Sequence, residues 1–170
     1  MKKAIITVAL LLFPFFASAQ SVEISAREYQ RTNSVVVTCA WVADAAGDVS
    51  FDIDETIDTV VSENGIGLAS RILGTYCGEA VTIPDPVTAP TADYDIAVVD
   101  GDGLSIFGTA LDDRSATLAE STAPQFVTPE GNIYGGRIVR STSGASFQTY
   151  SITISGAGDG GKGVLRLVFR

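Results

Sequence analysis

The side chains that most often carry out proton transfer and metal binding are sparse in this sequence. Histidine is absent from all 170 residues, which removes the usual general base, the commonest zinc ligand and any serine–histidine or cysteine–histidine pair. Ser105 follows Gly103, but the second glycine of a nucleophile elbow is displaced and no histidine could activate the hydroxyl. We therefore assign no catalytic residue, expect no cofactor and interpret the chain as a non-enzyme.

A glycine-rich loop, Gly156–Gly163, matches two phosphate-binding patterns by letter. Its first, third and sixth residues spell GxGxxG, and the glycine before Lys162 imitates a P-loop. Both patterns need a strand before the loop and a helix after it, because the phosphate binds at the helix N-terminus. Here a strand-like run follows, and Gly163 stands where a P-loop has its hydroxyl. The loop is therefore predicted to be a flexible hairpin.

Aspartates recur at alternate positions in two segments, 48–58 and 93–102. Calcium needs several oxygens that converge on one point, whereas alternate residues of a strand project in parallel. The turn at Asp100 also lacks the EF-hand spacing, and no local pattern marks a pair of glycosidase carboxylates. We interpret the first segment as a solvated acidic face, keep a calcium site as the alternative and assign no metal ligand.

Cys39 and Cys77 are the two cysteines of the chain. An even count in an exported protein favours a disulfide, and the two residues are therefore predicted to be bridged. The alternative is a pair of buried thiols that never meet, since each cysteine lies in a strand-like run.

The first twenty residues have the pattern of a signal peptide. Lys2 and Lys3 precede an uncharged apolar run that is too short to span a bilayer comfortably, and Ala17 to Ala19 supply the small residues that signal peptidase recognises. Cleavage after Ala19 would leave one domain, residues 20–170, exported to the periplasm or the medium with no stable membrane anchor. A retained anchor or a buried first strand is the alternative.

The formal charge of the chain is strongly negative. It is −9 for the whole sequence, and without Lys2 and Lys3 the balance is 9 basic against 20 acidic residues, or −11. Such a charge repels nucleic acid and anionic lipid at long range. It favours a soluble surface, a cationic partner or bound divalent cations, and no nucleic-acid partner is expected.

Apolar residues alternate with polar ones over most of the chain, which predicts strands. The clearest runs are 35–41, which is β-branched and largely apolar, 49–57, whose alternate residues are acidic, 94–98, 150–154 and 164–169. Aromatic residues at strand spacing are expected in the core and not on a ligand platform: Trp41, Phe51, Tyr76 and Tyr94.

Turn residues separate these runs. Asp100–Gly103 predicts a tight turn, and prolines punctuate an extended connection after residue 83. Only Thr109–Ser121 has helical spacing, with Leu111 and Leu118 on one face. Short strands at this spacing predict an all-β fold: an antiparallel β-sandwich, or a partly open barrel, with one short helix.

From about residue 35 onwards the chain resembles a family of small, poorly characterised bacteriophage structural proteins encoded among head and tail genes. The likeness is carried by four stretches: Cys39–Gly47; Ile83–Asp85; Ala89–Ile96 leading to Asp100–Leu104; and Ile152–Gly158 with Lys162–Val164. The resemblance implies a β-rich virion component, such as a capsid decoration or head accessory protein, with a tail-associated role also open. A signal peptide and a cysteine pair depart from that pattern.

Three functional hypotheses follow. The first is a non-enzymatic phage structural protein that docks on a capsid or tail lattice, or on further copies of itself, through a strand edge or the acidic face. The second is a periplasmic or secreted β-sandwich that serves in adhesion or ligand binding. A hydrolase that uses carboxylates alone comes last.

Overall fold

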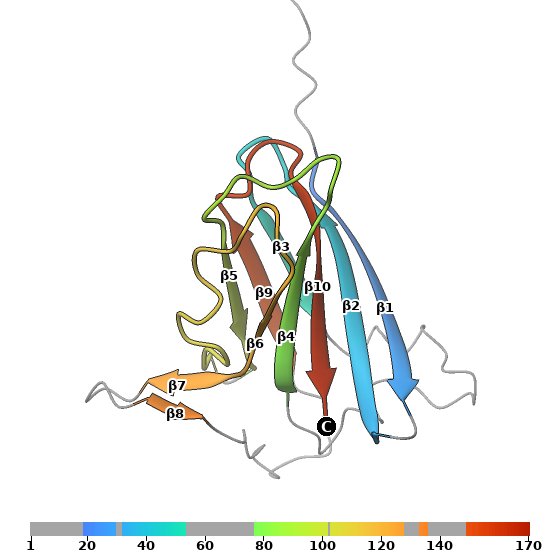
Figure 1. Cartoon of the computed structure of the whole chain (residues 1–170), viewed down its shortest axis with the longest axis vertical. Coiled ribbons are helices and arrows are strands. Elements are labelled where there is room, and N and C mark those ends of the chain that lie inside the picture. The colour runs from blue at the N-terminus through green and yellow to red at the C-terminus, as the bar shows by residue number, and fades with distance from the viewer. Residues whose placement is uncertain (1–18, 30–31, 54–76, 102, 128–132, 136–148) are drawn as a thin grey trace, which may run out of the picture.

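The computed structural model describes residues 19–29, 32–53, 77–101, 103–127, 133–135 and 149–170. These residues form ten β-strands, and none of them is helical (Figure 1). No helix able to cross a membrane occurs among them. The predicted all-β class is confirmed, with two antiparallel sheets of five and three strands.

The larger sheet has the strand order β1-β2-β10-β4-β6. Its members are β1 (Ser21–Tyr29), β2 (Ser34–Val42), β10 (Lys162–Phe169), β4 (Cys77–Pro84) and β6 (Glu120–Thr122). Every pairing is antiparallel, and β2 is held along its length by β1 on one side and β10 on the other. The β-branched residues of β2 suit this central position, because such side chains pack well on a pleated surface.

The smaller sheet has the order β3-β9-β5 and packs behind the larger one in Figure 1. It consists of β3 (Val49–Ile53), β9 (Tyr150–Ser155) and β5 (Asp95–Val99). Aromatic pairs join the two layers: the rings of Tyr150 and Phe169 lie 5.6 Å apart, and those of Trp41 and Tyr94 lie 5.7 Å apart. Trp41 and Tyr94 are both buried, as the sequence predicted.

Alternate residues of the facing strands fill the core between the sheets. They include Val35, Val37, Cys39, Leu165 and Leu167 from the larger sheet and Val49, Ile53, Ile96, Val98, Ile152 and Ile154 from the smaller one. The predicted period of two is thus confirmed for these runs. A separate two-stranded ribbon, β7 (Gln125–Val127) with β8 (Ile133–Gly135), lies at one end of the sandwich (Figure 1).

The Gly156–Gly163 loop is not the hairpin that the sequence predicted. It leaves β9 in the smaller sheet and enters β10 in the larger one, so it crosses between the layers. Period and turn residues alone do not distinguish these two connections, because both join antiparallel runs of similar length. The turn at Asp100 agrees better with its prediction: the Gly103 N–H donates to the Asp100 carbonyl at 2.9 Å.

The predicted helix over Thr109–Ser121 is wrong. The segment forms a series of turns whose backbone bonds to the start of the smaller sheet: the Ile96 N–H donates to the Leu111 carbonyl, and the Arg114 N–H to that of Tyr94. Asp113 takes a positive φ of 54°, which a helix does not allow. Leu111 is buried while Leu118 is 65% exposed, so the two do not share a buried face.

The predicted disulfide is also wrong, because Cys39 and Cys77 are both free and buried. Cys39 lies on β2 and Cys77 on β4, and β10 runs between these strands. Two strand spacings separate the Cα atoms by at least about 9 Å, whereas a bridge needs about 7 Å or less. The alternative of two buried thiols that never meet is the one observed.

Several predictions lie partly or wholly outside the described residues. The signal peptide is one, although Ala19 and Gln20 are described and exposed immediately before β1. The others concern Tyr76, Asp102 and the 54–58 part of the acidic run.

Candidate binding surface on the five-stranded sheet

The outer faces of the two sheets differ in chemistry. On the smaller sheet most outward residues are exposed and polar: Ser50, Asp52, Asp95, Ser151, Thr153 and Ser155. The exceptions on this face are Ala97, which is exposed, and Val99, which is partly buried. On the three central strands of the larger sheet the outward residues are mostly aliphatic and only partly buried: Val36, Ala40, Val42, Val81, Ile83, Val164 and Val168. An antiparallel sheet with one face in water usually alternates apolar-in with polar-out. The larger sheet breaks that rule.

Strand register brings the aliphatic side chains into rows. Val164 on β10 stands opposite Ala40 on β2 and opposite Ile83 on β4. Glu23 on β1 continues this row beyond Ala40. The centre of the outer face is therefore apolar and has a carboxylate at one side. We call the seven aliphatic residues given above, together with Thr38 and Arg166 between them, the outer face of the larger sheet.

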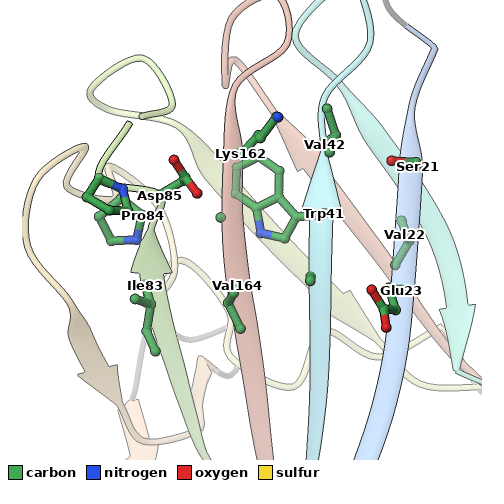
Figure 2. Close-up of a pocket in the computed structure, with 13 residues that line it drawn as sticks. Ser21, Val22, Glu23, Trp41, Val42, Ile83, Pro84, Asp85, Lys162 and Val164 are labelled. Atoms are coloured by element: carbon green, nitrogen blue, oxygen red, sulfur yellow. The ribbon is translucent and has the colours of Figure 1, made fainter. Parts of the chain in front are cut away.

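A hollow of about 400 Å³ lies at one end of this face, where β10 begins and β4 ends (Figure 2). Ala40, Val164 and Ile83 line it, and the Pro84–Pro86 segment adds a further wall. Glu23 and Asp85 lie on opposite sides of the hollow, and Lys162 comes from the β10 strand between them (Figure 2). The hollow thus combines an apolar lining with two acidic groups and one basic group.

The Pro84–Pro86 segment that forms this wall is held in place by hydrogen bonds of Asp85. The Asp85 Oδ1 accepts from the backbone N–H of Thr88 at 2.7 Å and of Val87 at 2.8 Å. These two bonds lower the pKa of Asp85 below its ordinary value, with the larger effect from Thr88. The nearby Lys162 charge lowers it further by a smaller amount. The Asp85 N–H donates to the Lys162 carbonyl at 3.0 Å, and the Lys162 N–H donates to the Thr88 carbonyl at 2.9 Å. The wall is therefore tied directly to the start of β10.

Three connections meet at the same end of the sandwich: 43–48, 85–94 and 156–161 (Figure 1). The Ala43 N–H donates to Gly161, the Ala157 N–H to Gly47, and the Thr91 N–H to Ala157. The glycines permit this close backbone packing. A Cβ on Gly47 would lie 2.6 Å from the nitrogen of Gly158.

These contacts explain the phosphate-like glycines of the 156–161 loop. Three of its amides donate to protein acceptors: Ala157 to the Gly47 carbonyl, Gly161 to the Gly158 carbonyl, and Gly156 to Asp48 Oδ1 at 3.4 Å. A phosphate cradle needs amides that point at the ligand. The glycine spacing serves chain packing between two layers, and β10 follows where a phosphate site would need a helix.

The described carboxylates mostly accept hydrogen bonds from turns and strands, and three of them lie near one another: burial first, and then the charges of Asp95 and Asp113, raise the pKa of Asp112. Asp52 accepts from the Ser151 hydroxyl at 2.7 Å, and Asp95 accepts from the Asp113 N–H at 2.9 Å. The Asp100 carboxylate accepts from the Leu104 N–H at 2.8 Å and thereby closes its turn. Within the described ranges, no three acidic or cysteine side chains form a group that could hold a metal ion.

Ser105 and Arg114 both have structural contacts. The Ser105 hydroxyl accepts from the Gly108 N–H at 3.1 Å. Arg114, for which the sequence predicted no role, has a side chain only 12% exposed. Its Nε lies 3.5 Å from Glu120 Oε2, and one Nη donates to Thr122 at 2.9 Å. The Nε contact is a charge contact without an aligned hydrogen bond. The pair fastens the 109–119 turns to β6, and no local sequence pattern marks it.

Comparison with protein-family models, curated proteins and solved structures found no match for this chain.

Proposed function

We propose that this chain is an exported, non-enzymatic β-sandwich that binds a protein surface through the outer face of its larger sheet. The contrast between the two outer faces carries the proposal. Ser151, Thr153 and Ser155 face water on the smaller sheet, while Ala40, Val164 and Ile83 occupy the corresponding outward positions in the centre of the larger one. Partly exposed aliphatic side chains gathered on one face are typical of an interaction site.

The residues that could suggest catalysis support a binding role instead. The Ser105 hydroxyl and amides of the glycine loop form hydrogen bonds that hold turns and the crossing between the two sheets. Histidine is absent, and the hydrolase considered from the sequence would use carboxylates alone. The described carboxylates of Asp52, Asp95 and Asp100 accept hydrogen bonds within the fold at separate places.

A phage particle is the surface that the sequence resemblance favours, as a capsid decoration or head accessory protein. The stretches that carry the resemblance meet at the loop end of the sandwich, beside the hollow: Ala43 bonds to Gly161, Thr91 to Ala157, and Asp85 to Lys162. A protein built to decorate a lattice needs a rigid fold, a soluble outer face and an apolar patch. The last two correspond to the smaller and the larger sheet.

Two measurements test this proposal. Mass spectrometry of purified particles asks whether the chain is present, and a capsid or portal gene beside its own would agree with presence. Val164→Glu places a charge in the middle of the apolar row, so it should abolish attachment to particles that lack the protein while the fold stays intact. Thr153→Glu is the matched control, because it places the same charge on an exposed strand position of the opposite sheet. Absence of the chain from particles of a phage that encodes it would remove the virion role.

The hollow favours a second candidate, a periplasmic or secreted ligand-binding module. Its volume of about 400 Å³ lies in the range of small-ligand sites, roughly 300–1,000 Å³. Trp41 is the single tryptophan of the chain and is among the residues around the hollow. A ligand that enters the hollow should therefore change the tryptophan emission of the protein. Ala40→Leu places a larger side chain in the lining of the hollow and should abolish that change.

A further inference from the structure

The outer edge of β1 is distinct from the outer face of the larger sheet, and no strand of the described residues pairs with it. β1 is the end strand of its sheet and pairs with β2 over all nine residues, Ser21 to Tyr29, with no bulge. It contains no proline, glycine or lysine. Proteins usually protect an edge strand with proline, charged side chains, bulges, very short strands or inward-pointing charges, because its unpaired backbone groups accept another strand. On the partly buried side of β1, Glu28 is the one charged residue of this kind.

The charges of β1 are arranged so that the strand complements itself. Glu23, Ser25 and Arg27 alternate with partly buried residues and point to the exposed side of the sheet. When β1 pairs antiparallel with an identical strand about Ser25, Glu23 stands opposite Arg27 of the second copy. The symmetry repeats this contact, so one interface contains two opposite-charge pairs.

We infer that β1 pairs edge to edge with β1 of a second copy of this chain, centred on Ser25. The neighbouring registers are less favourable. Centring on Glu23 or on Arg27 sets like charges opposite each other, and centring on Ile24 or Ala26 leaves both charges opposite uncharged residues. Opposite charges directly across two strands stabilise a pair and like charges destabilise it. The register centred on Ser25 also uses all nine residues.

One observed contact and one expected pairing support this arrangement. The guanidinium carbon of Arg27 lies 5.3 Å from the centre of the Tyr29 ring, and Tyr29 is 44% exposed at the end of the strand. This cation–π contact holds the Arg27 side chain over the exposed side of the strand. On the inner side, Ile24 would stand opposite Ala26 of the second copy, and both already pack against the core. The pairing would join two five-stranded sheets into one continuous sheet.

The inference does not depend on the proposed function, since it concerns the edge and not the outer face. Sedimentation velocity over a concentration series should show that the purified protein is a dimer. Arg27→Glu sets Glu23 against a glutamate, and Glu23→Arg sets Arg27 against an arginine. Each variant alone should dissociate about tenfold or more readily than the wild type.

Mixing the two variants provides the decisive measurement. One chain then has glutamates at both positions and the other has arginines, so the mixture should form a one-to-one heterodimer as tightly as the wild type. Thr153→Glu is the matched control, because it adds a charge at an exposed strand position of the smaller sheet, away from β1 and from the outer face of the larger sheet. It should leave the dimer unchanged.

Cross-linking tests the register separately. Ser25→Cys should form an intermolecular disulfide under mild oxidation, because the symmetry axis places the two copies of residue 25 opposite each other. Ser121→Cys, on the opposite edge strand, should not. A wild-type protein that remains monomeric throughout, or a dimer that is indifferent to both charge reversals, would overturn the inference.

Discussion

The indole of Trp41 lies across Gly163 of the neighbouring strand. The two residues are register partners on β2 and β10, and a Cβ built on Gly163 would lie 2.6 Å from Trp41 Cζ2. The absence of a side chain at residue 163 leaves room for the indole, whose ring centroid lies 5.7 Å from that of Tyr94. Trp41 and Gly163 both lie around the hollow, and Trp41 also pairs with Tyr94 between the two layers.

Gly163→Ala should therefore destabilise the fold. The added methyl group would also come within 3.1 Å of the Ile83 carbonyl, so the ring or a strand must shift. We expect a loss of about 1–3 kcal/mol in the free energy of unfolding, the usual cost of overpacking. Trp41→Ala should lose about 3–5 kcal/mol, as a buried aromatic does. Chemical denaturation measures both.

A double variant tests whether the Trp41 indole is the group that the methyl group of Gly163→Ala would meet. If the indole is the obstacle, Gly163→Ala should cost little in a Trp41→Leu background, and the two changes will not be additive. Full additivity would show that the methyl group collides with something else.

Both cysteines should behave as buried thiols. Cys39 is 0% exposed and Cys77 is 1% exposed, and neither is bridged. A thiol-alkylating reagent should leave the native protein unmodified and should modify two residues after denaturation without reductant. Mass spectrometry counts the labels. A denatured protein that takes up no label until it is reduced would restore the disulfide that the sequence predicted.

The same thiols predict a loss of stability at alkaline pH. Burial raises the pKa of each from 9.0 to about 12, while backbone contacts partly oppose this shift for Cys77. Between these two pH values the unfolded chain releases thiol protons that the folded chain retains, so the free energy of unfolding falls as the pH rises. It is independent of these groups below about pH 9. Burial also raises the pKa of Tyr94, which acts in the same direction.

Substitution of both cysteines by alanine should flatten this pH profile between pH 9 and pH 12, although it lowers stability at neutral pH. Denaturation midpoints across the range provide the measurement. An unchanged slope in the double variant would assign the alkaline loss to Tyr94 and other groups.

Arg114→Met should weaken the attachment of the 109–119 turns. The substitution keeps the aliphatic stem but removes the charge contact with Glu120 and the bond to Thr122. We expect a loss of about 1–3 kcal/mol, towards the lower end because Glu120 is 33% exposed. Arg166→Met, on an exposed strand position, is the control and should change stability by less than about 0.5 kcal/mol.

The sequence predicted the strands well because their side chains have one period and one buried side. The alternation of Val35, Val37 and Cys39 needs no knowledge of the neighbouring strand to indicate a buried face. The order of strands within a sheet, in contrast, cannot be predicted from local alternation. Cys39 and Cys77 looked like partners because nothing local reveals that β10, from the far end of the chain, lies between them.

The helix was predicted wrongly and the candidate surface was not predicted, for related reasons. Thr109–Ser121 has helical spacing, but its backbone bonds to Tyr94 and Ile96, and these tertiary contacts outweigh a weak local preference. The aliphatic outer face could not be predicted, because β2 is apolar at nearly every position. The same pattern is typical of a strand that is buried on both faces of its sheet. Only the layer arrangement shows that one of those sides is partly open.

The last prediction concerns the N-terminus. The Gln20 side chain forms two hydrogen bonds with the free edge of β3: its Oε1 accepts from the Ser50 N–H at 3.0 Å, and its Nε2 donates to the Ser50 carbonyl at 3.4 Å. Cleavage after Ala19, at the exposed position before β1, would make Gln20 the first residue. Intact mass of the secreted protein should show a chain that begins at Gln20. Cyclisation would join the α-amine to the Gln20 Cδ and release Nε2 as ammonia, so the cyclised form cannot donate the bond to the Ser50 carbonyl. A secreted protein that retains Met1 would contradict the cleavage.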